Sequence, residues 1–68
     1  MKLFEWTGGE HSNTSKYVLK YNNCYILIKN DKSIVTIQGI QKNWPEAFNY
    51  WKEIKDAKQI NMIKMRYL

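Results

Sequence analysis

The chain has 68 residues, of which 44% are hydrophobic and 15% aromatic, and it carries a formal net charge of +5. This length indicates one small domain, residues 1–68, which buries only about 60% of the surface of its unfolded form. The single cysteine excludes an internal disulfide bond, and no apolar run is long enough for a membrane span. We therefore expect a soluble, cytoplasmic protein with no membrane partner.

Residues 2–6 alternate in a way that favours a first strand, with Phe4 and Trp6 facing inward. Gly8 and Gly9 end this strand, and residues 10–15 are polar, which indicates an exposed loop. His11 lies in that loop without a second histidine or a cysteine pair at ligand spacing. We expect neither a metal nor any other cofactor.

Residues 16–39 predict a meander of three antiparallel strands joined by two tight turns. Asn22 and Asn23 form the first turn, because asparagine suits a two-residue hairpin loop, and Tyr21 then lies opposite Cys24. The second turn falls within residues 30–33. A two-residue loop at Asn30-Asp31 or at Asp31-Lys32 places the following side chains on the same faces. One face is then apolar, and it carries Tyr17, Leu19, Tyr21, Cys24, Ile26, Ile28, Val35 and Ile37.

The opposite face of this meander is mixed, and all its charges are positive. It carries Lys16, Val18, Lys20, Tyr25, Leu27, Lys29, Ile34, Thr36 and Gln38.

Residues 43–58 predict a helix that packs on the apolar face. Asn43 is placed to cap the helix, Pro45 suits its first turn, and Glu46 lies three residues after the cap. The apolar side chains recur at helical spacing and form one stripe, which consists of Trp44, Ala47, Phe48, Trp51 and Ile54.

Residues 61–67 predict a C-terminal strand, because Ile63, Met65 and Tyr67 alternate with Lys64 and Arg66. The alternative is a helix that continues through Ile60 and Ile63. The expected fold class is α+β: an antiparallel sheet of four to five strands in the order β-βββ-α-β, with one helix packed on one face.

The sequence shows no nucleophile beside a base and no pair of carboxylates in an apolar setting. We therefore expect a protein that is not an enzyme and has no small-molecule substrate. The first functional hypothesis is a module that binds nucleic acid through phosphates, since lysines neutralise phosphates and an exposed aromatic ring stacks on a base. The residues expected to form this site are Lys16, Lys20, Tyr25, Lys29, Lys64 and Arg66.

Two other readings of the basic face stay open. A chain rich in Lys, Asn and Ile with one Arg is typical of an AT-rich genome, so part of the charge has a codon-usage explanation, and the lysines are then simply solvated. The other is a protein-binding module, either a homodimer or an inhibitor or accessory factor of the kind that mobile elements encode. It would use the apolar strip of Val18, Leu27 and Ile34 on the same face.

Overall fold

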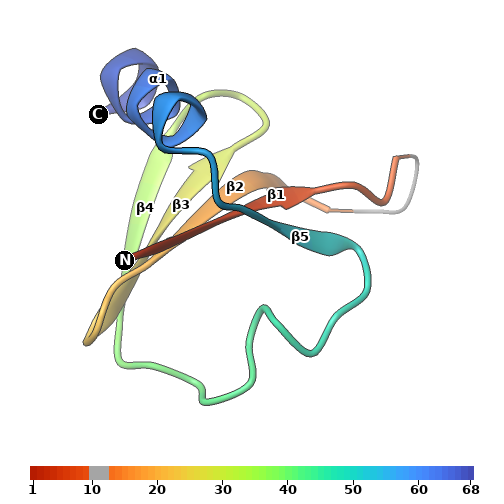
Figure 1. Cartoon of the computed structure of the whole chain (residues 1–68). Coiled ribbons are helices and arrows are strands. Elements are labelled where there is room, and N and C mark those ends of the chain that lie inside the picture. Colours follow the sequence, from red (N-terminus) through yellow and green to blue (C-terminus); the bar gives the residue numbers. More distant parts are fainter. Residues whose placement is uncertain (10–12) are drawn as a thin grey trace.

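The computed structural model describes residues 1–9 and 13–68. These residues form a five-stranded antiparallel sheet and one C-terminal helix, so the fold class is α+β (Figure 1). The spatial order of the strands is β4-β3-β2-β1-β5, which leaves β4 and β5 at the two edges. The elements are β1 Lys2–Trp6, β2 Ser15–Lys20, β3 Cys24–Lys29, β4 Ile34–Gln38, β5 Trp51–Ile54 and α1 Ala57–Tyr67.

The two faces of the sheet are covered by different parts of the chain. Helix α1 lies across one face, and residues 39–50 loop beneath the other (Figure 1). We call these the helix-covered face and the loop-covered face. The core of the helix-covered face consists of Leu3, Leu19, Ile28, Ile54 and Ile63. The core of the loop-covered face consists of Phe4, Val18, Tyr25 and Trp51, with Trp6, Leu27 and Trp44 packed against it.

The first predicted strand is confirmed as β1, which lies inside the sheet between β2 and β5. Because both faces of the sheet are covered here, Leu3 and Phe4 are both buried although they point in opposite directions. The predicted loop of residues 10–15 and its histidine, His11, cannot be compared in full, since residues 10–12 lie outside the described part of the chain.

The first hairpin has the predicted register. The backbone N–H of Tyr21 donates to the carbonyl of Cys24 across the turn, and Leu19 lies opposite Ile26. The alternation around Asn22 and Asn23 predicts Lys16 opposite Lys29, and this is wrong, because the register shifts near the start of β2 and places Ser15 opposite Lys29. Such an irregularity inserts an extra residue into one strand.

The second turn differs from the prediction, and the difference reverses the faces of β4. The loop has three residues, Asn30 to Lys32, and Lys32 adopts a positive φ of 71°. A three-residue hairpin loop of this kind combines a tight turn with one left-handed residue. Because its length is odd, Ile34 lies opposite Ile28, and Val35 lies opposite Leu27. The predicted places of Val35 and Ile37 on the face of Ile28 are therefore wrong, and so is that of Ile34 on the face of Leu27.

The helix predicted over residues 43–58 is absent. Residues 39–50 form turns, the Trp44–Pro45 peptide bond is cis, and Trp51 to Ile54 form β5. This strand pairs with β1, so that Trp51 lies opposite Trp6 and Ile54 opposite Leu3. Strand pairing at the otherwise open edge of β1 therefore prevails over the local helical pattern.

The predicted C-terminal strand is also wrong, and the alternative of a helix is confirmed. The carboxylate of Asp56 accepts a hydrogen bond of 3.0 Å from the backbone N–H of Lys58 and caps α1. Ile60, Ile63 and Tyr67 pack on the sheet at helical spacing. Met65, which the strand pattern placed inward, is 85% exposed.

Candidate functional site

The structure does not gather the six residues of the predicted phosphate site on one face. Lys64 and Arg66 belong to α1, so they lie on the side of the helix-covered face and not beside the predicted lysines of β2 and β3. Lys16 is exposed, near the irregularity in β2. The ammonium group of Lys29 donates to the hydroxyl of Thr14 at 3.0 Å.

The two central residues of that predicted site hold the fold together. The Lys20 side chain is only 13% exposed, and its ammonium group binds both carboxylate oxygens of Glu46. Tyr25 is 3% exposed, so its ring is not free to stack on a base. Its hydroxyl lies 2.9 Å from the carbonyl oxygens of Gln41 and Trp44 and accepts from the Gln41 N–H at 3.0 Å. Both side chains fasten residues 39–50 to the sheet.

The predicted apolar strip is not assembled either. Val18 is fully buried in the core of the loop-covered face. Ile34 is exposed, but it lies on the helix-covered face because of the three-residue turn. Leu27 is half-buried beneath β4, where it lines a pocket.

Strand β4 is instead the most exposed strand of the sheet, and every one of its residues is exposed. Its apolar side chains are unusually accessible: Ile34 is 43% exposed, Val35 41% and Ile37 44%. Ile40, just beyond the strand, is 37% exposed. The sequence contains this apolar run, but only the position of β4 at the edge of the sheet shows that nothing in the described chain covers it.

The outer edge of β4 offers backbone hydrogen-bonding groups. At the two ends of the β3–β4 pairing, Lys29 donates to the carbonyl of Ser33, and Gly39 donates to the carbonyl of Asn23. Bonded and unbonded residues alternate along an antiparallel pair, so the odd-numbered residues of β4 bond to β3. The N–H and C=O groups of Ile34, Thr36 and Gln38 therefore point away from the sheet.

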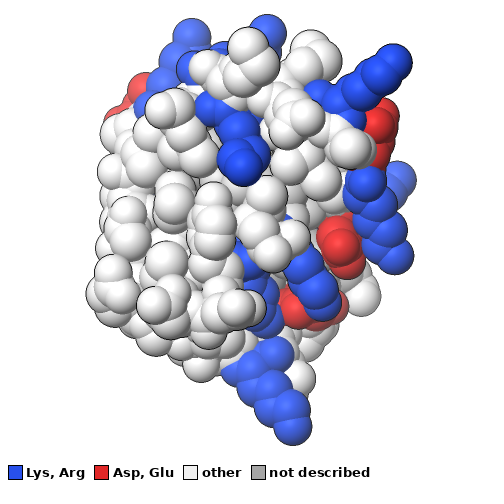
Figure 2. Space-filling view, turned by 60° about the vertical axis from the view of Figure 1, so that its left-hand side comes forward, with Lys and Arg blue, Asp and Glu red and all other residues white. Residues whose placement is uncertain are grey.

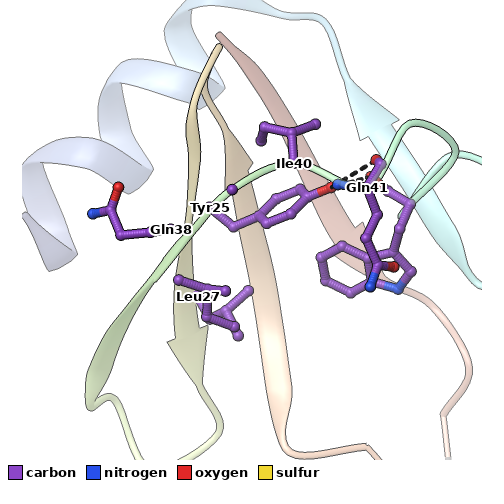
Figure 3. Close-up of a pocket in the computed structure, with 8 residues that line it drawn as sticks. Tyr25, Leu27, Gln38, Ile40 and Gln41 are labelled. Carbon is purple, nitrogen blue, oxygen red and sulfur yellow. Dashed lines mark hydrogen bonds between the residues drawn. The ribbon is translucent and has the colours of Figure 1, made fainter.

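A pocket of about 550 Å³ adjoins this edge on the loop-covered face. Figure 3 shows it between Leu27, the ring of Tyr25 and the segment that leads from Gln38 at the end of β4 to Gln41, with Ile40 above the ring. Gln41 forms one wall of the pocket, and its hydrogen bonds with the Tyr25 hydroxyl hold it in place. The other lining residues are Ile37, Gly39 and Trp44.

The two edges of the sheet differ in charge. Strand β5 carries Lys52 and Glu53, and such charges on an edge strand discourage pairing with another chain. Strand β4 carries no charge, and residues 33–41 contain neither a charged residue nor a proline. Figure 2 shows a broad surface without charged side chains, with lysine and arginine placed mainly around it. This contrast marks β4 as the unprotected edge.

Two side chains, one in the turn before β4 and one in β2, have shifted pKa values. Hydrogen bonds from the hydroxyl and then the backbone N–H of Ser33 hold the pKa of Asp31 below its ordinary value of 3.8. Burial, followed by the nearby Glu5 carboxylate, raises the pKa of Tyr17. Within residues 1–9 and 13–68, no three His, Cys, Asp or Glu side chains come together in a way that could hold a metal ion.

No helix in the described ranges combines the length and the apolar character that crossing a membrane requires. The chain matches no protein-family model, and neither a curated protein nor a solved structure is significantly similar to it.

Proposed function

We propose that this chain is a small, non-enzymatic protein-binding module whose β4 edge accepts an extended strand from a protein partner. The observation that carries the proposal is the exposed and uncharged edge that β4 presents. Its side chains are exposed, its outer backbone groups face away from the sheet, and it lacks the charges that protect β5.

An added strand would bind as the next strand of the sheet. Its backbone would pair with the outward groups of Ile34, Thr36 and Gln38, which gives affinity with little dependence on sequence. Its alternate side chains would lie beside Val35 and Ile37 on the loop-covered face, next to the pocket. Apolar side chains at these positions would remove exposed isoleucine and valine surface from water.

A strand-forming peptide tests this proposal. The probe is the fluorescein-labelled heptapeptide Glu-Val-Thr-Val-Thr-Val-Glu, whose acidic ends suit a chain of net charge +5. Fluorescence anisotropy should give a dissociation constant below about 1 mM, as expected for a short strand that must become ordered on binding. Amide exchange should show new protection at Ile34, Thr36 and Gln38.

The matched variants are Thr36→Pro at the β4 edge and Lys52→Arg, which keeps the edge charge, at the β5 edge. Proline at position 36 removes an outward N–H, and edge strands tolerate proline where the N–H faces solvent. Peptide binding should fall at least about tenfold in Thr36→Pro, which corresponds to one lost backbone hydrogen bond, and should not change in Lys52→Arg. Equal binding by a folded Thr36→Pro variant, or a wild type whose β4 edge pairs neither with the peptide nor with another chain, would refute the proposal.

We propose phosphate-mediated nucleic-acid binding as the second candidate, supported by the net charge of +5 and by the exposure of Lys16 and Arg66. Such binding should weaken steeply between about 50 and 200 mM salt. The test is an anisotropy titration with single- and double-stranded oligonucleotides. A Lys16→Glu, Arg66→Glu double variant that keeps the wild-type affinity would rule this candidate out.

A further inference from the structure

We infer that the strand which docks on β4 is β4 of a second copy of this chain, paired antiparallel about a two-fold axis at Thr36; this rests on the proposed function. The pairing would join two five-stranded sheets into one continuous sheet. A symmetric interface of this kind uses the same surface on both partners, which is the commonest arrangement in homodimers.

The backbone of β4 fits this register. Only Ile34, Thr36 and Gln38 point their backbone groups outward, so these residues must form the hydrogen-bonded pairs. An axis at Thr36 pairs Thr36 with the partner's Thr36, and Ile34 with the partner's Gln38. Every outward N–H and C=O of the strand then has a partner.

The side chains fit the same register. Between the hydrogen-bonded pairs, Val35 falls opposite the partner's Ile37, and Ile37 falls opposite the partner's Val35. Side chains approach most closely in such unbonded pairs, and β-branched pairs are favourable there. Because Val35 and Ile37 share the loop-covered face, the four side chains form one apolar cluster that extends the row of Leu27 and Tyr25.

Charge also permits a second copy. Two chains of net charge +5 repel one another, but residues 33–41 carry no charge, so no lysine meets a lysine across the axis. When the register is extended past the strand, Lys32 falls opposite the partner's Ile40. Strand β4 is moreover already ordered, so the second copy does not lose the conformational entropy that a flexible peptide loses on binding.

The pairing surface is short, which sets the expected affinity. A five-residue edge offers less contact than a standard interface of about 800 Å² per partner. We therefore expect a reversible dimer with a micromolar dissociation constant, measured on the whole chain by sedimentation equilibrium.

A charge-exchange experiment tests the register directly, because position 36 faces itself across the axis. Thr36→Lys alone and Thr36→Glu alone should each dimerise at least about tenfold more weakly than the wild type, since like charges would face each other. An equimolar mixture of the two variants should dimerise about as strongly as the wild type. Circular dichroism establishes that each variant is folded, and Lys52→Arg, which keeps the charge of the other edge, serves as the control.

Amide exchange of the wild-type chain tests the dimer without any substitution. The amides of Ile34, Thr36 and Gln38 should exchange slowly at concentrations that favour the dimer and quickly on dilution. The amides of Val35 and Ile37 should stay protected throughout, because they bond to β3.

The outcomes separate this inference from the function on which it rests. A wild type that stays monomeric up to about 1 mM while binding the heptapeptide overturns the second copy but leaves the edge-binding function standing. Failure of both experiments overturns both. A dimer that Thr36→Lys and Thr36→Glu do not weaken uses another surface, and this also overturns the inference.

Discussion

The ammonium nitrogen of Lys20 lies 2.9 Å and 3.0 Å from the two carboxylate oxygens of Glu46 and joins β2 to the loop that covers the sheet. Lys2 adds a longer contact of 3.7 Å to the same carboxylate. Partial burial acts to raise the pKa of Glu46, but the hydrogen bond and charge of Lys20 outweigh it. The pKa of Glu46 is consequently lowered from its ordinary value of 4.5.

This ion pair predicts a stability that depends on pH. Because the pKa of Glu46 is lower in the folded state, the contribution is complete above about pH 4.5 and is lost as the pH falls through the folded pKa. Glu46→Gln should lower the unfolding free energy at pH 7 by about 1 kcal/mol or less, since the Glu46 side chain is 34% exposed. Urea denaturation should show this difference at pH 7 and little difference near pH 3.

The control for this prediction is Glu53→Gln, because Glu53 forms no ion pair with any residue that the structure describes. Its effect should be small and should not follow the same pH dependence. An equal loss of stability in both variants at pH 7 would show that the Lys20 contact has no specific role.

The strands of the first hairpin could be predicted because local and tertiary preferences agree there. Asn22 and Asn23 separate two strand-forming runs, and the alternation around them matches the observed faces. The second turn could not be predicted in the same way. A two-residue loop in either position would place Val35 and Ile37 on the face of Ile28. The observed loop has one residue more, and this moves every side chain of β4 to the opposite face.

The errors beyond β4 come from two local patterns, the spacing of the aromatic residues and the alternation of the last residues. Trp44 and Trp51 are seven residues apart, which suits one side of a helix. In the structure they lie in different segments, yet their rings still pack together, with ring centroids 5.9 Å apart. Aromatic spacing therefore identified Trp44 and Trp51 as core residues but not the backbone that carries them, and it was wrong for Phe48, which is 54% exposed. The aspartate that caps α1, Asp56, was a better local signal than the alternation of the last residues.

The candidate site could be predicted only in part. Leu27 and Ile34 were expected at an interface, and both lie near β4, but on opposite faces. Lys20 and Tyr25 were chosen for their chemistry, whereas the folded chain buries them under residues 39–50. Which strand is at the edge follows from the pairing of β5 with β1, and a local pattern does not contain that information.

The hydroxyl of Tyr25 predicts a larger effect on stability than an ordinary buried tyrosine. Tyr25→Phe would leave the carbonyls of Gln41 and Trp44 and the N–H of Gln41 without this partner. Gln41 is exposed and its carbonyl also accepts from the Trp44 N–H at 3.3 Å, so the unfolding free energy should fall by about 1 kcal/mol, at the low end of the cost of unsatisfied groups. The matched control is Tyr21→Phe, whose hydroxyl makes no hydrogen bond within the described ranges. Equal effects of the two substitutions in urea denaturation would contradict the role of the Tyr25 hydroxyl.

The left-handed conformation of Lys32 predicts a stabilising substitution. Residues with a side chain adopt a positive φ at a cost of about 1–2 kcal/mol, which glycine avoids, although glycine gains entropy in the unfolded chain. Lys32→Gly should therefore raise the unfolding free energy by about 0.5 kcal/mol. Lys29→Gly, in the neighbouring strand, should lower it. A thermal melt in which Lys32→Gly is clearly less stable than the wild type would argue against the three-residue turn.

Gly8 predicts the most severe effect of a single added methyl group. A Cβ at this position would lie 2.4 Å from Cζ2 and 2.6 Å from Cε2 of Trp6, closer than carbon atoms approach in folded proteins. The Trp6 ring has little space to move, because its centroid lies 5.4 Å from that of the Tyr50 ring and 5.3 Å from that of the Trp51 ring. Gly8→Ala should therefore lower the unfolding free energy by about 1–3 kcal/mol, as overpacking does, and should change the tryptophan fluorescence.

The matched substitution is Gly9→Asn. Gly9 has a positive φ of 57°, which asparagine tolerates, and an added Cβ there would have no neighbour within 4 Å among residues 1–9 and 13–68. Gly9→Asn should lower the unfolding free energy much less than Gly8→Ala, because it changes only the backbone preference and creates no steric overlap. If the two variants unfold at the same urea concentration with unchanged fluorescence, the close approach of Gly8 to Trp6 does not limit stability.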